Sequence, residues 1–211
     1  MTFYDLHSHK PAQQVEDITI ISIDLRDENC LTDIAENAGY YSVGIHPWHI
    51  DKNLMPEVRK LVTLPSVVAI GETGLDKNKG NLSLQQDIFE EHIRLSEETK
   101  KPLIIHCVKA WDDLFRIQKS FKPSMPWIIH GFRGNGNLAA QLLNAGMYLS
   151  FGLHNNAESL KAAWDKKRLF TETDDMDINI REVSTTIAGK LNITVKELLD
   201  EVRENLIYFF M

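Results

Sequence analysis

The sequence predicts an α/β protein with the (β/α)8 TIM barrel fold, and two patterns support this prediction. Short apolar segments rich in β-branched residues recur along the 211 residues, and segments of helical character separate them. Such near-continuous apolar segments are typical of parallel strands that are buried on both faces. Eight strands that alternate with helices favour a closed barrel over an open sheet. The predicted strands cover residues 3–8, 18–25, 40–46, 66–72, 102–107, 126–131, 147–152 and 168–174.

Helix-start signals support the segments between the strands. Ser83 with Gln86 matches a capping box ahead of the sequence IFEEHIRLSEETKK, and Thr194 with Glu197 repeats the pattern before LLDEVREN. One connection breaks the alternation, because residues 10–17 between the first two strands are too few for a crossover helix. We therefore expect a barrel that is shortened in its first β/α unit.

Composition predicts a single cytoplasmic domain over residues 1–211. Hydrophobic residues make up 43% of the chain and charged residues 25%, which suits one globular core. No stretch approaches 18 consecutive apolar residues, and no leader pattern precedes the first strand, so we expect no membrane association. Cys30 and Cys107 form no disulfide framework, which fits a reducing compartment. Nothing in the sequence indicates an obligatory protein partner.

The formal net charge of -7 argues against a broad nucleic-acid-binding surface, which normally needs clustered Lys and Arg. It leaves open an active site that handles phosphate. Two bound divalent cations would change the charge from -7 to -3 and would place positive charge where a phosphate binds.

Histidines and carboxylates follow the predicted strands at their carboxyl ends. His7 and His9 project from the same face of a strand, because successive side chains alternate between faces. In a parallel barrel these ends share one rim, where active sites lie. Any one of these residues could instead be a buried structural residue, but together they predict a metal site. The six candidates are His7, His9, Glu72, His106, His130 and Asp174.

Six candidate ligands are about twice the number that one catalytic zinc site uses, so the sequence predicts two ions. We assign His7 and His9 with Asp174 to one ion, and His106 with His130 to the other. Glu72 is assigned to both ions, since a carboxylate bridges two metals through its two oxygens. Mixed imidazole and carboxylate ligands suit Zn²⁺, Mg²⁺ or Mn²⁺.

The motifs DLHSH, VGIHPWH, AIGETGLD, PLIIHC, IIHGFRG and ETD, in this order and with the closing ENLIYFF, resemble the TatD family of metal-dependent deoxyribonucleases. The resemblance covers nearly the whole chain. It implies an amidohydrolase-like barrel, the same six metal ligands and DNA as a transient substrate. It also implies that His46, in GIHP, approaches the substrate phosphate.

The predicted chemistry is hydrolysis by a metal-activated water, in which Asp174 and Glu72 are the catalytic carboxylates and Asp174 accepts the proton. Among the loop cations, the candidate phosphate contacts are Lys77, Lys79, Lys109 and Arg133, and Arg133 is the strongest because its planar fork suits two phosphate oxygens. Trp48 is either a stacking surface for a base or a packing residue, and His92 is expected on the surface of a helix.

Two other functions remain open at this point. The same binuclear site would also activate water against a small phosphate ester, a carboxyl ester, a lactone or an amide. A metal-stabilised scaffold without catalysis is the alternative outside the enzyme class.

Overall fold

The computed structural model describes residues 1–26, 34 and 39–210, so Cys30 lies outside the described part of the chain. Within this part, eight strands form one sheet in chain order. The strands follow seven of the eight predicted segments to within a few residues at either end, and β4 runs further than its segment. They are β1 (Tyr4–Ser8), β2 (Ile18–Ile23), β3 (Tyr40–Val43), β4 (Val67–Asp76), β5 (Leu103–Val108), β6 (Trp127–Ile129), β7 (Tyr148–Phe151) and β8 (Leu169–Thr171). The pairs β1–β2, β3–β4, β4–β5, β6–β7 and β7–β8 are parallel.

The chain folds into two compact units. The first unit joins Met1–Ile21 to Ile128–Met211, and the second unit is Ser22–Trp127. The boundaries fall within β2 and at the start of β6. The expectation of one domain over residues 1–211 stays a prediction.

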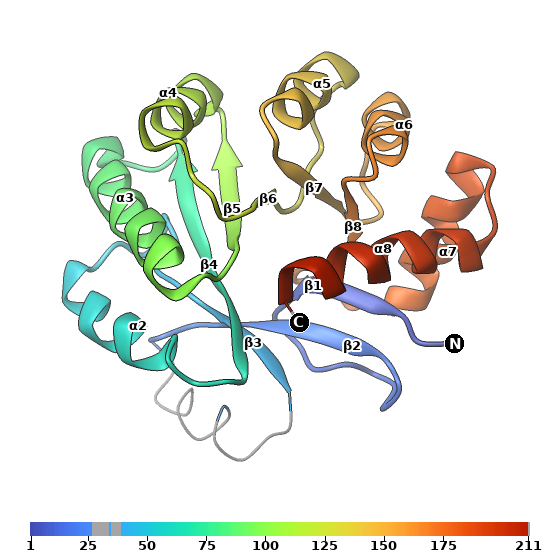
Figure 1. Ribbon diagram of the computed structural model, residues 1–211, viewed down its shortest axis with the longest axis horizontal. Helices are drawn as coiled ribbons and strands as arrows, with labels where there is room; N and C mark the ends of the chain where they lie inside the picture. Colours follow the sequence, from blue (N-terminus) through green and yellow to red (C-terminus); the bar gives the residue numbers. More distant parts are fainter. Residues whose placement is uncertain (27–33, 35–38, 211) are drawn as a thin grey trace. The chain divides into compact units, whose positions relative to one another are not determined.

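In the first unit, β8 returns to β1 and is joined to it by backbone and side-chain hydrogen bonds. Ser8 and Asp174 form a parallel bridge, and the Thr171 hydroxyl donates to the Tyr4 carbonyl at 2.8 Å. Helices α5 and α6 lie side by side, and α8 packs on β8 and β1 (Figure 1). The helices are α5 (Gly136–Asn144), α6 (Ala157–Asp165), α7 (Ile180–Leu191) and α8 (Val195–Phe210).

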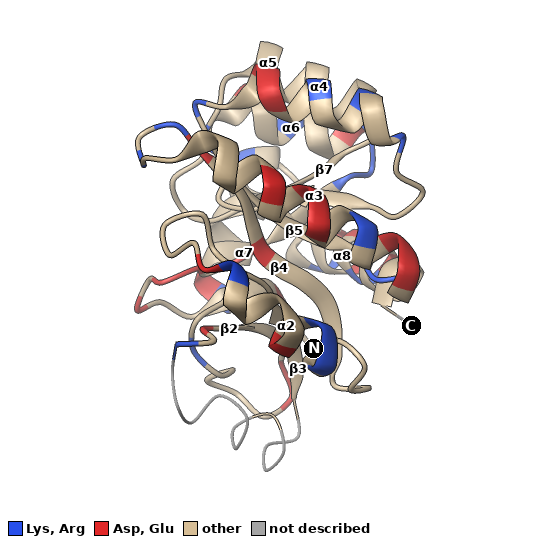
Figure 2. Cartoon of the chain, turned by 90° about the vertical axis from the view of Figure 1, so that its left-hand side faces the viewer, with Lys and Arg blue, Asp and Glu red and all other residues tan. Residues whose placement is uncertain are grey.

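In the second unit, the long strand β4 pairs with β3 and β5, and α3 packs along it. The inward face of α3 is apolar, with Ile88, Phe89 and Ile93 almost completely buried. Its outward face carries acidic and basic residues (Figure 2). The helices are the 3-10 helix η1 (Lys52–Leu54), α2 (Met55–Leu61), α3 (Leu82–Thr99) and α4 (Trp111–Phe121).

The connection from β1 to β2 contains no helix over residues 9–17, all of which the structure describes, and this confirms the shortened first β/α unit. The two predicted capping boxes differ in outcome. The box at Thr194 forms, since the Glu197 carboxylate accepts from the Thr194 N–H at 2.7 Å and the Glu197 N–H donates to the Thr194 hydroxyl at 3.2 Å. The box at Ser83 is wrong, because α3 already begins at Leu82 and Asn81 occupies the N-cap in the left-handed conformation. Among the described residues, no helix combines the length and the apolar character that crossing a bilayer would need.

Candidate metal centres

The first unit brings three of the predicted ligands together. One ligand atom each of His7, His130 and Asp174 lies within 4.8 Å of the others. His7 is completely buried, and its Nε2 lies 3.6 Å from Asp174 Oδ1. His9 is more exposed, and its Nε2 lies 3.7 Å from the same oxygen. These three imidazoles therefore surround one carboxylate, at the point where β8 returns to β1.

Backbone pairing fixes the position of Asp174. Its N–H donates to the His7 carbonyl at 2.9 Å, and the His9 N–H donates to the Asp174 carbonyl at 3.1 Å. Asp174 has a φ of 57°, a left-handed conformation that Asp and Asn adopt more readily than most residues. The bridge between β1 and the segment after β8 thus sets the distance between the carboxylate and the imidazoles.

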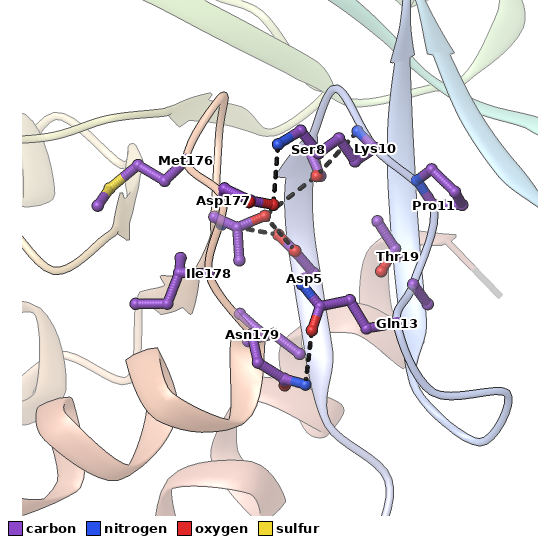
Figure 3. Close-up of a pocket in the computed structure, with 13 residues that line it drawn as sticks. Asp5, Ser8, Lys10, Pro11, Gln13, Thr19, Met176, Asp177, Ile178 and Asn179 are labelled. Atoms are coloured by element: carbon purple, nitrogen blue, oxygen red, sulfur yellow. Dashed lines mark hydrogen bonds and ion pairs between the residues drawn. The ribbon is translucent and has the colours of Figure 1, made fainter.

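A buried carboxylate holds the residue before Asp174. Asp5 accepts hydrogen bonds from the N–H of Thr173 at 3.0 Å and from its hydroxyl at 2.6 Å. Burial raises the pKa of Asp5 to about 7, although these hydrogen bonds act in the opposite direction. Asp5 and Ser8 line a cavity of about 340 Å³, over which Lys10 forms an ion pair with Asp177 at 3.1 Å (Figure 3). This network ties the loop after β8 to β1.

Glu172 is a further buried carboxylate beside the first cluster. Its Oε1 accepts a hydrogen bond from the Gly131 N–H, directly after His130, and lies 3.7 Å from His130 Nδ1. Glu172 and Asp174 both lie in the segment that follows β8. Glu172 therefore orients the His130 segment, a role that carboxylates often have beside metal-binding histidines.

The second unit holds a second cluster, formed by His46, Glu72 and His106. Glu72 Oε1 lies 2.8 Å from His46 Nε2 and 2.8 Å from His106 Nδ1. One ligand atom of each of the three again lies within 4.8 Å of the others. The carboxylate is almost fully buried and the imidazoles are partly exposed, so the cluster opens on its histidine side.

Asp76 extends the second cluster, although the sequence pattern did not single it out. Its Oδ2 accepts a hydrogen bond from Trp48 Nε1 at 2.7 Å and lies 3.5 Å from His106 Nε2. Burial alone would raise the pKa of Asp76, but the hydrogen bonds from Trp48 and Asn78 bring it below its ordinary value. A signal was nevertheless present, because Asp76 is an even number of residues from Glu72 and β4 continues to it.

His92 was predicted on the surface, and that prediction is wrong. The side chain is completely buried in α3. Its Nε2 accepts from the Ile45 N–H at 3.1 Å, so Nδ1 carries the proton and donates to the Ile88 carbonyl at 2.8 Å. Burial lowers the pKa of His92 to about 4. Its spacing from Ile88 and Phe89 places it on the apolar face of the helix, which was the signal for burial.

The predicted substrate contacts are distributed over both units. His46 lies in the second cluster itself, against Glu72. Lys109 is exposed between β5 and α4, and Arg133 is exposed in the loop after β6. The assignment of His130 to the ion of His106, and of Glu72 to both ions, joins residues of different units and stays a prediction. Within its own unit, His130 lies with His7, and their ring centroids are 4.4 Å apart.

The chemistry of both donor sets fits a divalent cation. Each cluster offers two imidazole nitrogens and a carboxylate oxygen, which is the mixed N and O set that Zn²⁺ and Mn²⁺ accept. Buried carboxylates beside each set supply hydrogen bonds of the kind that orient metal ligands. Each of the two donor sets therefore suits a divalent metal ion.

Comparison with known proteins identifies the family of the chain. The family model described as TatD related DNase matches residues 6–210. The uncharacterized metal-dependent hydrolase YcfH of Escherichia coli is 30% identical over 81% of this chain and 73% of its own length. A similarly named Buchnera aphidicola protein is 37% identical over 54% of this chain. That match spans about half the length of the Buchnera protein, at 48%.

Solved structures show the same fold. The crystal structure of YjjV, a TatD homologue from Escherichia coli, has a TM-score of 0.81 at 20% identity and covers 99% of this chain and 97% of its own. A TatD family hydrolase from Entamoeba histolytica has a TM-score of 0.77. These likenesses confirm the predicted (β/α)8 barrel.

Fold and donor sets together are those of a (β/α)8 barrel protein with candidate metal-binding clusters. Since the family model covers nearly the whole sequence, the chain belongs to the TatD-related DNase family.

Proposed function

We propose that this protein is a deoxyribonuclease that hydrolyses phosphodiester bonds of DNA, with two divalent ions bound at its two clusters. The observation that carries the proposal is that each compact unit holds its own set of two histidines and a carboxylate. Two-metal sites are typical of nucleases and phosphatases, in which water displaces an alcohol from phosphorus. The family model supports the nuclease activity within this class.

A bound divalent ion would lower the pKa of water towards 7 and offset charge on the phosphoryl oxygens. The side chains of the protein would transfer the proton, hold the ligands in place and bind the phosphates. Asp174, whose side chain is 27% exposed, would accept the proton of the attacking water. A new bond forms between the water oxygen and phosphorus while the bond to the ester oxygen breaks, and the departing alcohol takes a proton from solvent. Glu72 would hold His46 and His106 in place, and Arg133 and Lys109 would neutralise the phosphates of the strand.

A hydrolase of small esters, lactones or amides is the second candidate, and the net charge of -7 favours it. An acidic chain attracts a polyanion less strongly than a neutral or small substrate. The chemistry at the two clusters would be the same for this second candidate. The cytoplasmic location and the absence of an obligatory protein partner remain proposals alongside either function.

Digestion of end-labelled single-stranded DNA tests the nuclease, with Mg²⁺, Mn²⁺ or Zn²⁺ supplied in turn. We expect the wild type to shorten the strand and His106→Ala to lose at least about 100-fold in rate, because one ligand of the second cluster is gone. His154→Ala, at an exposed histidine outside both clusters, is the matched control and should retain the wild-type rate. A fully active His106→Ala would contradict the role of the cluster. Hydrolysis of a small ester by a wild type that leaves DNA intact would favour the second candidate.

A further inference from the structure

Trp48 lies beside the second cluster with half of its surface exposed. The side chain is 49% accessible, although tryptophan is usually well buried. Its position is nevertheless fixed at two points. The indole Nε1–H donates to Asp76 Oδ2 at 2.7 Å, and the backbone N–H donates to His46 Nδ1 at 3.1 Å. A large aromatic plane is therefore held in solvent by residues of the cluster itself.

The orientation of the indole is set by the imidazoles next to it. Its ring centroid is 5.1 Å from that of His46, at an interplanar angle of 89°, and 5.8 Å from that of His106, at 79°. Both imidazole rings thus lie nearly perpendicular to the indole, and neither of them is stacked on it. Such a fixed, half-exposed plane loses little conformational entropy when another flat group stacks on it.

A cationic group lies over the same indole. The Lys79 ammonium lies 4.2 Å from the centroid of the Trp48 ring, on the loop after β4. Both residues belong to the second unit. The exposed indole thus has one cation over its ring and one carboxylate at its Nε1–H.

We propose that Trp48 and Lys79 form a subsite for one unpaired nucleotide of the substrate. The base stacks on the exposed indole, and the Lys79 ammonium leaves the ring for the phosphate of that nucleotide. A lysine suits this exchange, because its charge sits on a flexible four-carbon stem. The inference rests on the proposed nuclease function and adds its substrate form. A base within a duplex has both faces covered by its neighbours, so the subsite selects single strands or frayed ends.

A purely structural Trp48 would act by holding Asp76 through its Nε1–H. The two roles separate by substitution. Trp48→Ala removes both the plane and the hydrogen bond, whereas Trp48→Phe keeps an aromatic plane and loses the donor. Stacking therefore predicts that phenylalanine restores binding, and a structural role predicts that it does not.

The test measures binding of dye-labelled oligonucleotides by fluorescence anisotropy. The ligands are a phosphorothioate single strand, which resists hydrolysis, the same backbone without bases, and a blunt duplex, each with Mg²⁺. We expect Trp48→Ala to raise the Kd of the single strand by at least about 5-fold, the lower limit for loss of one stacked base, and to leave the Kd of the abasic strand unchanged. Trp48→Phe should stay close to the wild type. Tyr208→Ala, at a tyrosine that is 80% exposed, is the matched aromatic control and should change neither Kd.

Lys79→Ala supplies an independent readout. Loss of one phosphate contact should weaken the base-bearing and the abasic strands equally, and should reduce the slope of log K against log salt by about 0.7. An unchanged slope would contradict the phosphate contact of Lys79.

The outcomes separate this subsite from the nuclease proposal. If Trp48→Ala binds the single strand with the Kd of the wild type, and the wild type cleaves DNA, the subsite is wrong and the nuclease proposal stands. If Trp48→Ala and Trp48→Phe are equally weak, Trp48 acts through Asp76 and the stacking role is wrong. If the wild type neither binds nor cleaves any DNA but hydrolyses a small phosphodiester, both proposals are wrong.

Discussion

Single residues away from the ligand atoms set the geometry of the candidate site. His92 shows this most directly, since it is completely buried and bonds the backbone of Ile45, one residue before His46. A buried N–H without an acceptor costs about 1–3 kcal/mol. We therefore expect His92→Leu to lower the free energy of unfolding at pH 7 by about 2 kcal/mol and to reduce activity by displacing His46. Denaturant unfolding and DNA cleavage measure the two effects, with His154→Ala as the control.

The same residue predicts a pH dependence. Burial lowers the pKa of folded His92 from 6.5 to about 4, so between these values the unfolded chain binds a proton that the folded chain does not. Folded-state stability from neutral His92 is thus present above pH 6.5 and is lost as the pH falls towards 4. At 1.36 kcal/mol per pKa unit, the stability of the wild type relative to His92→Leu should fall by about 3 kcal/mol across this window, so that the variant becomes the more stable protein near pH 4. If the difference in the free energy of unfolding between the wild type and His92→Leu stayed constant from about pH 7 to pH 4, the buried, neutral ring would be contradicted.

At the scale of elements, the approach of β4 to β5 carries the second cluster. Gly74 has a φ of 139° and lies opposite His106, and a Cβ there would lie 2.1 Å from the His106 carbonyl oxygen. Gly74→Ala should therefore separate the strands, lower the free energy of unfolding by roughly 3 kcal/mol or more, and move His106 away from Glu72. Thermal unfolding measures the loss. Gly80→Ala, where a Cβ meets nothing within 4 Å, is the matched control and should change stability by less than about 0.5 kcal/mol. Equal melting temperatures for the two variants would contradict the close approach.

Elements also show what the sequence can and cannot predict. Strand periodicity predicted the buried strands, because the order of apolar and polar residue types indicates both side-chain alternation and burial. The candidate ligands lie within these strands or shortly after them. The periodicity ended β4 at Glu72 and so missed Asp76, since GETGLD contains two glycines that interrupt the apolar pattern. His92 was predicted on the surface because its polar side chain was given more weight than its position on the apolar face of the helix. The capping pattern at Ser83 failed because a local motif has no information on where the preceding loop ends.

For the whole molecule, the prediction of two ions has a direct consequence. The candidate ligands divide between the units, with His7, His130 and Asp174 in the first and His46, Glu72 and His106 in the second. We expect the wild type to bind two equivalents of metal, His130→Ala and His106→Ala about one each, and the double variant none, as measured by elemental analysis after gel filtration.

Metal binding should also stabilise the fold in steps, because an ion that binds only the folded chain adds about 2.7 kcal/mol per site when the free ion is at 100 times its Kd. The melting temperature of the wild type should rise with added Mn²⁺ or Zn²⁺ and fall with a chelator. Each single variant should show a smaller rise, since it keeps one donor set. If either substitution alone abolished all metal binding and the whole thermal shift, the two clusters would not be independent sites. Two retained equivalents in both variants would place the ions elsewhere in the chain.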